Sequence, residues 1–203
     1  MLSADKVLTT TRAVRRRLDI ERPVLRAVVL DCVRIATQAP AGVNRSPLRW
    51  LLVDDAAVVS QAGELYRQAV IETSKTRRVR AGEERMYDSV DHLAEIMPRM
   101  PVLAFPYSKA PPPTEPLMHA LTFWTSTVPA IWSMQLALRS RGLGSTMTTA
   151  HLMFAAEAAD VLGLPRSYTQ LGLLPIAYTV GVDFKPASRP PTDELVIWNH
   201  YEG

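Results

Sequence analysis

The sequence is poor in the residues that cross-link small proteins or bind metals. Among its 203 residues it has a single cysteine, Cys32, and four scattered histidines, His92, His119, His151 and His200. An internal disulfide is therefore excluded, and no metal site is expected. A chain of this length buries about 70% of its unfolded surface, so its core needs no such support.

Long apolar runs are also missing. No uninterrupted apolar stretch approaches the roughly 18–20 residues of a membrane helix, and the first residues, MLSADK, contain no apolar signal core. We therefore expect a cytoplasmic protein with no membrane partner.

Several catalytic signatures are absent as well. There is no P-loop and no Gly-x-Ser-x-Gly elbow, and the GLGS segment at 142–145 lacks the third glycine of a dinucleotide fingerprint. Hydrolase and phosphotransferase functions lose their usual support.

The charge is small, at a formal +3, but the positive residues are clustered. Four arginines fall within residues 12–17, and three more within 77–80. Each cluster is either a solvated basic face or an anion site, for which the planar guanidinium suits a phosphate group. A nucleic-acid partner is not expected, because no aromatic residues are interleaved with either cluster.

The apolar spacing predicts helices separated by a few strands. Helices are expected from Pro23 to about 39, from the N-cap pair Asp54-Asp55 onward, over 117–141 and over 154–162, and strands over 50–53, 101–105 and 171–180. The long helix should be buried on most sides and kinked or restarted at Pro129. Because strands and helices do not alternate regularly, we predict an α+β fold and a single domain over residues 1–203.

Proline-rich segments interrupt this pattern. Residues 106–116 hold five prolines and are expected to leave the sheet as a surface excursion, either a lid or a spacer. The loop at 40–47 is either a plain turn or a place where backbone approaches a flat ligand, because Ala41 and Gly42 are small and Asn44 offers a donor beside an acceptor.

Other single residues have two interpretations. Cys32 lies on an apolar helix face and is expected to be a buried, inert thiol. His151 is either an acid or a histidine at the edge of the core, and we favour the second. Trp124, Trp132 and Trp198 are expected to be core or interface residues.

The order of the motifs resembles that of the FMN-dependent nitroreductase family. The resemblance rests on TRAVRRRLD at 11–19, APAGVNRSP at 39–47, LALRSRGLGS at 136–145, LGLP at 162–165, LLPIAY at 173–178 and SRPP at 188–191. It leaves out roughly residues 54–120, where no motif is found. It implies a central, mostly antiparallel sheet flanked by helices, in an intertwined homodimer with FMN at the subunit interface.

The resemblance also implies how the cofactor is held. Arg12 and either Arg15 or Arg16 would bind the FMN phosphate together with Arg189. The family's usual serine is replaced here by Ala13 or Val14, depending on the register, so one contact is expected to be lost.

Two further segments would line the flavin. Four loop residues would come from the other subunit: Pro40, Ala41, Gly42 and Asn44. The family's usual Gln and Trp beside them are Ser46 and Leu48 here. After the glycine turn, the main chain of four residues would run along the reactive edge and hydrogen-bond flavin N5: Met147, Thr148, Thr149 and Ala150.

The function implied is that of an NAD(P)H oxidoreductase. NADH or NADPH would donate hydride to FMN, which would pass it to a nitroaromatic, quinone or similar small-molecule acceptor in a ping-pong cycle, with no catalytic side chain required. The alternatives are a family member specialised for dehalogenation or flavin fragmentation, and a flavin-sequestering protein without turnover.

Overall fold

The core of the molecule is a sheet in which all pairings are antiparallel. A computed structural model describes residues 2–201. Four strands lie in the order β1-β6-β3-β2, while β4 pairs with β6 and β5 with β3. The strands are β1 (Leu18–Asp19), β2 (Leu48–Val53), β3 (Val102–Ser108), β4 (Leu143–Ser145), β5 (Thr169–Gln170) and β6 (Leu174–Thr179).

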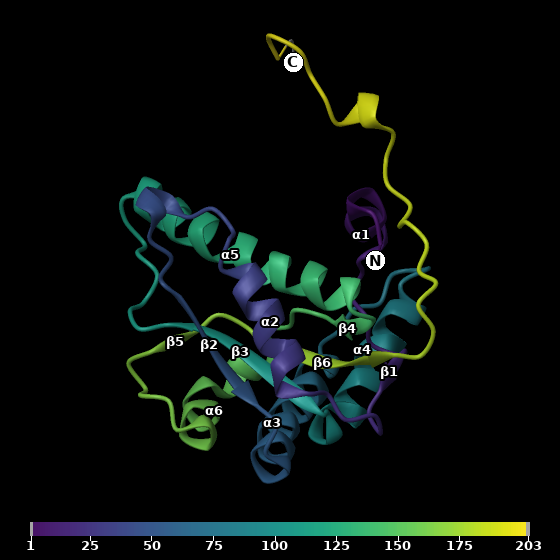
Figure 1. Ribbon diagram of the computed structural model, residues 1–203, viewed down its shortest axis with the longest axis vertical. Helices are drawn as coiled ribbons and strands as arrows, with labels where there is room; N and C mark the ends of the chain where they lie inside the picture. The colour runs from purple at the N-terminus through teal and green to yellow at the C-terminus, as the bar shows by residue number, and fades with distance from the viewer. Residues whose placement is uncertain (1, 202–203) are drawn as a thin grey trace.

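Helices cover both faces of this sheet (Figure 1). Helices α2 and α5 lie on one face, and α3, α4 and α6 pack against the other, while the short α1 lies beside the end of α5. The helices are α1 (Ala4–Thr10), α2 (Arg26–Ala36), α3 (Ala56–Ser74), α4 (Glu84–Ile96), α5 (Leu117–Ser140) and α6 (Ala155–Leu162). Short 3₁₀ turns occupy Gly42–Asn44, Met97–Arg99, Ala150–Phe154 and Thr192–Glu194.

Alternation along the central strand divides the core into two halves. Leu103 and Phe105 on β3 pack with α3 and α4, whereas Val102 and Ala104 face α2 and α5. Successive side chains of a strand point to opposite faces, so an unbroken apolar run here serves a sheet covered on both sides. The predicted α+β fold with a flanked antiparallel sheet is confirmed.

Local signals set several helix ends. The Asp55 carboxylate accepts hydrogen bonds from the amides of Ala57 and Val58 at 3.0 and 3.1 Å, capping α3 as expected. Gly163 adopts φ 62° and ends α6, as predicted. Helix α1, which is capped by Ser3, was not predicted.

The proline-rich excursion begins later than predicted. Pro106 and Tyr107 belong to β3, with Pro106 opposite Trp50 of β2. Proline is tolerated there because its carbonyl oxygen still accepts from the Leu171 amide at 2.8 Å, and only a donor is missing. The prediction that residue 106 leaves the sheet was wrong.

Helix α5 is also less buried than predicted. It runs through Pro129 as one helix without a second start, and Trp124 and Trp132 are 40% and 39% exposed. Trp198 is 82% exposed on a tail that leaves the body of the molecule (Figure 1). None of the three is a core residue of the single chain, and their place at an interface stays a prediction.

No helix within residues 2–201 is both long and apolar enough to cross a membrane.

Candidate functional site

Arginines line a hollow between the N-terminal segment and the start of α4. The hollow measures about 530 Å³. It is lined by Arg12, Ala13, Val14, Arg15, Arg16, Arg17, Gly82, Arg85, Met86, Ser89 and Phe184. Five of these residues carry a guanidinium, and no carboxylate is among the described residues that line the hollow. The hollow is therefore a region of positive potential suited to an anion.

Two of the five arginines hold the chain that follows β6. Arg12 Nη1 donates to the carbonyl oxygen of Lys185 at 3.0 Å. Arg17 donates to the carbonyls of Val180 and Asp183 at 2.8 and 3.0 Å. Because these acceptors are neutral carbonyl oxygens, the hydrogen bonds fix the positions of both guanidiniums without compensating their positive charges.

Arg15 and Arg16 are less constrained by hydrogen bonds and ion pairs. Arg16 lies 3.6 Å from the Asp88 carboxylate, with both side chains more than half exposed, so this ion pair is weak. Arg15 is half-buried and has no carboxylate within 4 Å in the described chain. The Val14 amide donates to the carbonyl of Ser145 at 3.0 Å, which ties the arginine segment to β4.

The segment that follows β4 lies next to this hollow. Thr148 pairs with Leu173 through two backbone hydrogen bonds of 2.9 and 2.8 Å. Burial raises the pKa of the nearby Tyr66, while the Thr148 side chain and the charge of Arg15 oppose the rise. The amide of Thr149 has no hydrogen-bond partner within residues 2–201, and this residue is exposed. Thr149 can therefore donate to a ligand, whereas the Thr148 amide is already engaged.

Directly after this segment comes a buried histidine. His151 is 1% exposed and meets the Phe105 ring edge-on at 5.7 Å. Gln170 lies beside it, but its amide donates to the Ala155 carbonyl at 2.8 Å and its own oxygen is unpartnered, as are both ring nitrogens. Burial lowers the pKa of His151 to about 4, with Gln170 opposing the shift. The ring is therefore neutral at pH 7 and belongs to the core, as favoured.

The 40–47 loop contacts the N-terminal half of α5. The Gly42 amide donates to Ser126 Oγ at 2.9 Å, and a Cβ at this glycine would lie 2.8 Å from Thr122. Val43 and Asn44 adopt φ values of 47° and 57°, and both are exposed. The glycine therefore allows a close approach to α5, whereas the predicted approach to a flat ligand stays a prediction.

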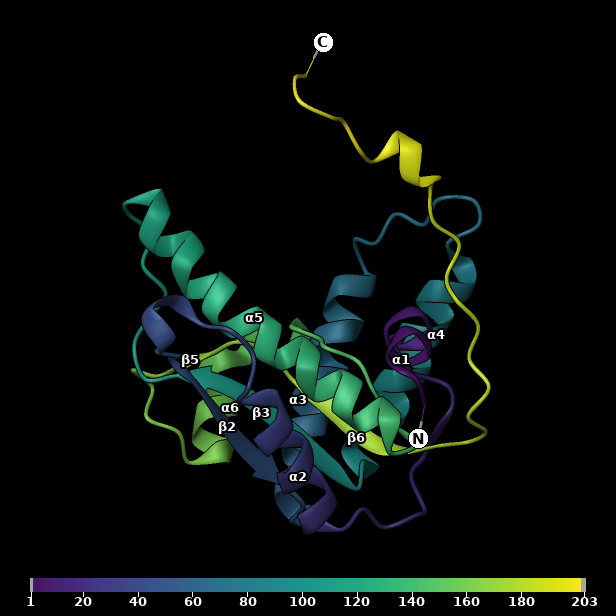
Figure 2. The same ribbon diagram turned by 45° about the horizontal axis from the view of Figure 1, so that its top comes forward.

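The two halves of the predicted site are therefore apart. The hollow lies near the C-terminal end of α5, where Arg139 donates to the Val182 carbonyl at 2.9 Å, whereas the loop contacts Ser126 (Figure 2). Thirteen residues of helix separate these contacts, about 20 Å. One chain does not bring both halves to a single ligand.

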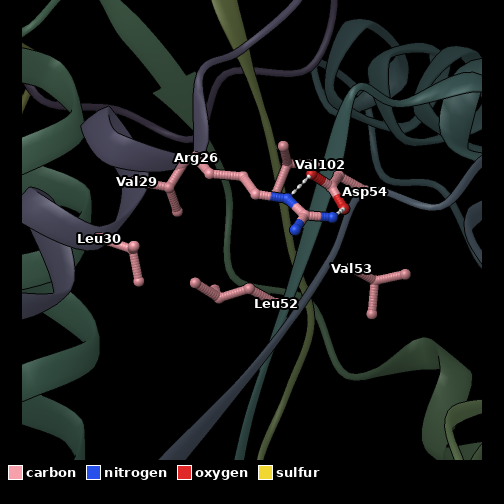
Figure 3. A pocket seen from close by; sticks show the side chains of 7 residues that line it. All are labelled: Arg26, Val29, Leu30, Leu52, Val53, Asp54 and Val102. Atoms are coloured by element: carbon pink, nitrogen blue, oxygen red, sulfur yellow. Dashed lines mark hydrogen bonds and ion pairs between the residues drawn. The ribbon is translucent and has the colours of Figure 1, made fainter.

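A separate pocket of about 320 Å³ lies between α2 and the end of β2 (Figure 3). Its walls are the apolar side chains of Val29, Leu30 and Leu52, with Val53 and Val102. At its rim Arg26 donates to both oxygens of Asp54 at 2.5 and 2.7 Å. Because this ion pair satisfies its own charges, the pocket offers no free polar group.

The sequence matches the nitroreductase family over residues 8–178. The chain belongs to this family. The match includes the arginine segment, the 40–47 loop and the 147–150 segment, and it ends before the tail that carries Arg189. Members of the family bind FMN and are commonly homodimeric.

Solved structures show the same nitroreductase fold at low sequence identity. An iodotyrosine deiodinase bound to FMN and 3-iodo-L-tyrosine is 20% identical, with a TM-score of 0.75 over 97% of this chain and 99% of its own. A BluB-like flavoprotein from Clostridium difficile 630 is 16% identical, with a TM-score of 0.72 over 98% and 100%. The FMN and NADPH-dependent nitroreductase NfnB from Sphingopyxis sp. strain HMH is 20% identical, with a TM-score of 0.70 over 98% and 100%. No curated protein sequence matches the chain.

The structure gathers some predicted nitroreductase site residues and leaves others apart. Five of them share the hollow: Arg12, Ala13, Val14, Arg15 and Arg16. Arg189 is exposed on the tail, with a single hydrogen bond to the carbonyl of Ser188. Sequence reasoning missed Arg85 and Tyr66, because nothing local distinguishes one arginine or one buried tyrosine from the rest of residues 54–120.

Cys32, which was predicted to be an inert thiol, lies on the buried face of α2 that the apolar spacing indicated. Cys32 is fully buried on α2. Burial raises its pKa to about 11, so the thiolate is negligible at neutral pH and nucleophilic chemistry at this residue is disfavoured.

Proposed function

We propose that this nitroreductase-family chain is an FMN-dependent NAD(P)H oxidoreductase acting on nitroaromatic, quinone or similar acceptors. The observation that carries the proposal is the hollow of five guanidiniums without a lining carboxylate. When bound, FMN would supply the hydride chemistry at N5, between NADH or NADPH and the acceptor. The protein would supply position and electrostatics, and no side chain is needed as a nucleophile or acid.

The hollow fits the phosphate end of FMN in charge and size. A phosphate monoester carries about −1.5 to −2 charges and several acceptor oxygens at pH 7, and arginine binds it in bidentate geometry. Ligand pockets typically measure about 300–1,000 Å³, and this hollow measures about 530 Å³. Arg12, Arg15 and Arg16 are the proposed phosphate ligands in the hollow, and we propose that Arg189 joins them from the tail.

The segment beside the hollow fits the ring end. Its Thr149 amide is unpartnered within the described chain and can donate to a ring nitrogen. Tyr66 would act as a positioning residue, because it is buried on α3 beside Thr148. The hydrogen bond from Val14 to Ser145 links the phosphate ligands to this edge, so both parts are held in one frame.

A second copy of the chain would complete the site. The loop residues Pro40, Ala41, Gly42 and Asn44 lie far from the arginine hollow of their own chain, so we propose that they reach the hollow of a partner. Helix α5, which contacts this loop through Thr122 and Ser126, has a different face that is apolar and exposed in a single chain. It presents Leu117, Leu121, Trp124, Val128 and Trp132, all at least 39% exposed and spaced three or four residues apart. Burying such a stripe drives association.

Purification and kinetics test this proposal. The protein should be yellow or take up FMN, run as a dimer, and oxidise NADH or NADPH with an acceptor. Varying both substrates should give parallel double-reciprocal lines, because donor and acceptor would use the same flavin face in turn.

Each competing function predicts a different result. Intersecting lines would refute the shared site. Bound FMN without NAD(P)H oxidation would favour flavin sequestration, and turnover of a halogenated phenol alone would favour dehalogenation. A colourless monomer that binds no FMN would refute the proposal.

A further inference from the structure

The basic segment between α3 and α4 carries charges that its own carboxylates do not neutralise. Lys75 is paired with Glu72, and Arg77 with Asp91, at 2.7 and 3.0 Å. In contrast, three arginines have no carboxylate within 4 Å in the described chain and are exposed: Arg78, Arg80 and Arg85. Arg78 and Arg80 have no role in the proposed flavin site, and Arg85, in α4, contributes to it so far only as one of the five guanidiniums of the hollow.

One of these arginines faces the flavin site. Arg85 lies in the first turn of α4 and lines the same hollow as Arg12, Arg15 and Arg16, with Gly82 and Ser89 beside it. A positive charge at the N-terminal end of a helix opposes the helix dipole. The carboxylates of Glu83 and Glu84 lie at the same helix end and accept hydrogen bonds from the amides of Arg80 and Gly82 at 3.1 and 2.9 Å, but neither pairs with Arg85.

The charge in the hollow exceeds what one phosphate neutralises. Five guanidiniums line it, and Asp88, outside the lining, forms a weak pair with only one of them. An FMN phosphate would offset about 1.5 to 2 charges. Two or more positive charges would remain in the hollow, and that of Arg85 lies on the side formed by α4.

We propose that Arg85 is the centre of a second anion subsite that binds a phosphate or carboxylate group of the substrate lying over the flavin. Arg78 and Arg80, on the loop that leads to Gly82, add to its positive potential. The inference rests on the proposed function. The anion has two sources in that reaction: the 2′-phosphate of NADPH, or a carboxylate on the acceptor.

Paired ligands distinguish the two sources and test the subsite by binding alone. Calorimetry on FMN-loaded protein would compare NADP⁺ with NAD⁺, and 4-nitrobenzoate with 4-nitrobenzyl alcohol. Arg85→Ala should weaken binding of either NADP⁺ or 4-nitrobenzoate about five- to tenfold, the loss of one exposed charge-assisted contact, and change binding of the counterpart that lacks the extra anionic group by less than twofold. Arg85→Lys should restore part of the affinity.

A matched variant controls for net charge. Arg99 is also exposed and unpaired within the described chain, but it follows the other end of α4, roughly 20 Å along the helix axis. Arg99→Ala should therefore leave all four affinities unchanged. Equal losses for Arg85→Ala and Arg99→Ala would mean that only long-range charge acts, which overturns the subsite.

Other outcomes also decide the matter. If Arg85→Ala leaves binding of both NADP⁺ and 4-nitrobenzoate unaffected, or weakens binding of both members of a pair alike, the inference is wrong. Loss of FMN in Arg85→Ala would make this residue a cofactor ligand and also overturn it. Failure of the proposed function would appear earlier and separately, as wild-type protein that takes up no FMN.

Discussion

Protonation of one buried histidine should control the acid stability of this protein. His151 is 1% exposed, and neither ring nitrogen has a hydrogen-bond partner. Burial lowers its pKa from 6.5 to about 4 in the folded protein. In the unfolded chain the ring is in water and takes up a proton near pH 6.5. Between these values the unfolded state binds more protons, so stability must fall as pH falls.

The size of the effect follows from the two pKa values. A group whose pKa is lowered on folding contributes its stability above the unfolded pKa and loses it as pH falls through the folded pKa. The difference between 6.5 and about 4 corresponds to about 3 kcal/mol in total. About 2 kcal/mol of this should already be lost at pH 5 relative to pH 8.

Urea unfolding of wild type and His151→Leu, at matched protein concentration and FMN content, measures this term. At pH 8 the variant should be close to wild type, because an apolar side chain replaces two unpartnered nitrogens in the core. At pH 5 it should be more stable than wild type by about 2 kcal/mol. His92→Leu, at an exposed position on α4, is the control and should follow wild type at both pH values. Equal pH slopes for wild type and His151→Leu would refute the reasoning.

Three further predictions concern packing and cofactor binding. Gly63→Ala should destabilise the protein by about 2 kcal/mol in urea unfolding, because the new Cβ would lie 2.5 Å from the Pro98 backbone, a clash only partly offset by helix propensity. Exposed Gln61→Ala should cost under about 0.5 kcal/mol, and equal effects would contradict the clash. Gly144→Ala should weaken FMN binding, measured by fluorescence titration, and lower stability, measured by urea unfolding, because its Cβ would lie 3.0 Å from Val14 and displace the arginine segment. Unchanged FMN affinity would show that this segment does not contact the cofactor. Arg15→Ala and Arg189→Ala should each weaken FMN binding by about 1.5–3 kcal/mol, measured by flavin retention and titration, and wild-type retention in either variant would remove that residue from the phosphate site.

Local patterns predicted much of this fold. Apolar spacing located α2, α5 and α6, and the Asp55 cap and Gly163 stop fall where they were expected. These features depend on hydrogen bonds and periodicity within a few residues, which a sequence states directly. The order of the motifs carried the family resemblance, and the resemblance in turn predicted the central antiparallel sheet.

Features that depend on tertiary neighbours were mispredicted or missed. Pro106 lies in β3 because the amide of Leu171 reaches its carbonyl, a partner 65 residues away that no local rule can supply. Arg85 meets the N-terminal arginines only through the packing of α4. For Trp124 and Trp132 the sequence left core and interface positions open, because hydrophobicity alone does not distinguish an exposed helix face from a buried one.

The places where this chain departs from ordinary folding rules coincide with the proposed site. Like charges are normally dispersed, yet five guanidiniums share one hollow; backbone amides are normally paired, yet that of Thr149 is not within the described chain; and the indole of Trp132 is left 39% exposed on α5. The clustered charges repel one another in the isolated chain, whereas the Thr149 amide is exposed and can bind water until a ligand replaces it. An anionic flavin would relieve the charge repulsion, and a second copy of the chain would cover the exposed indole. Stability therefore need not be optimised in the single chain, because binding to the folded state alone adds to it by mass action.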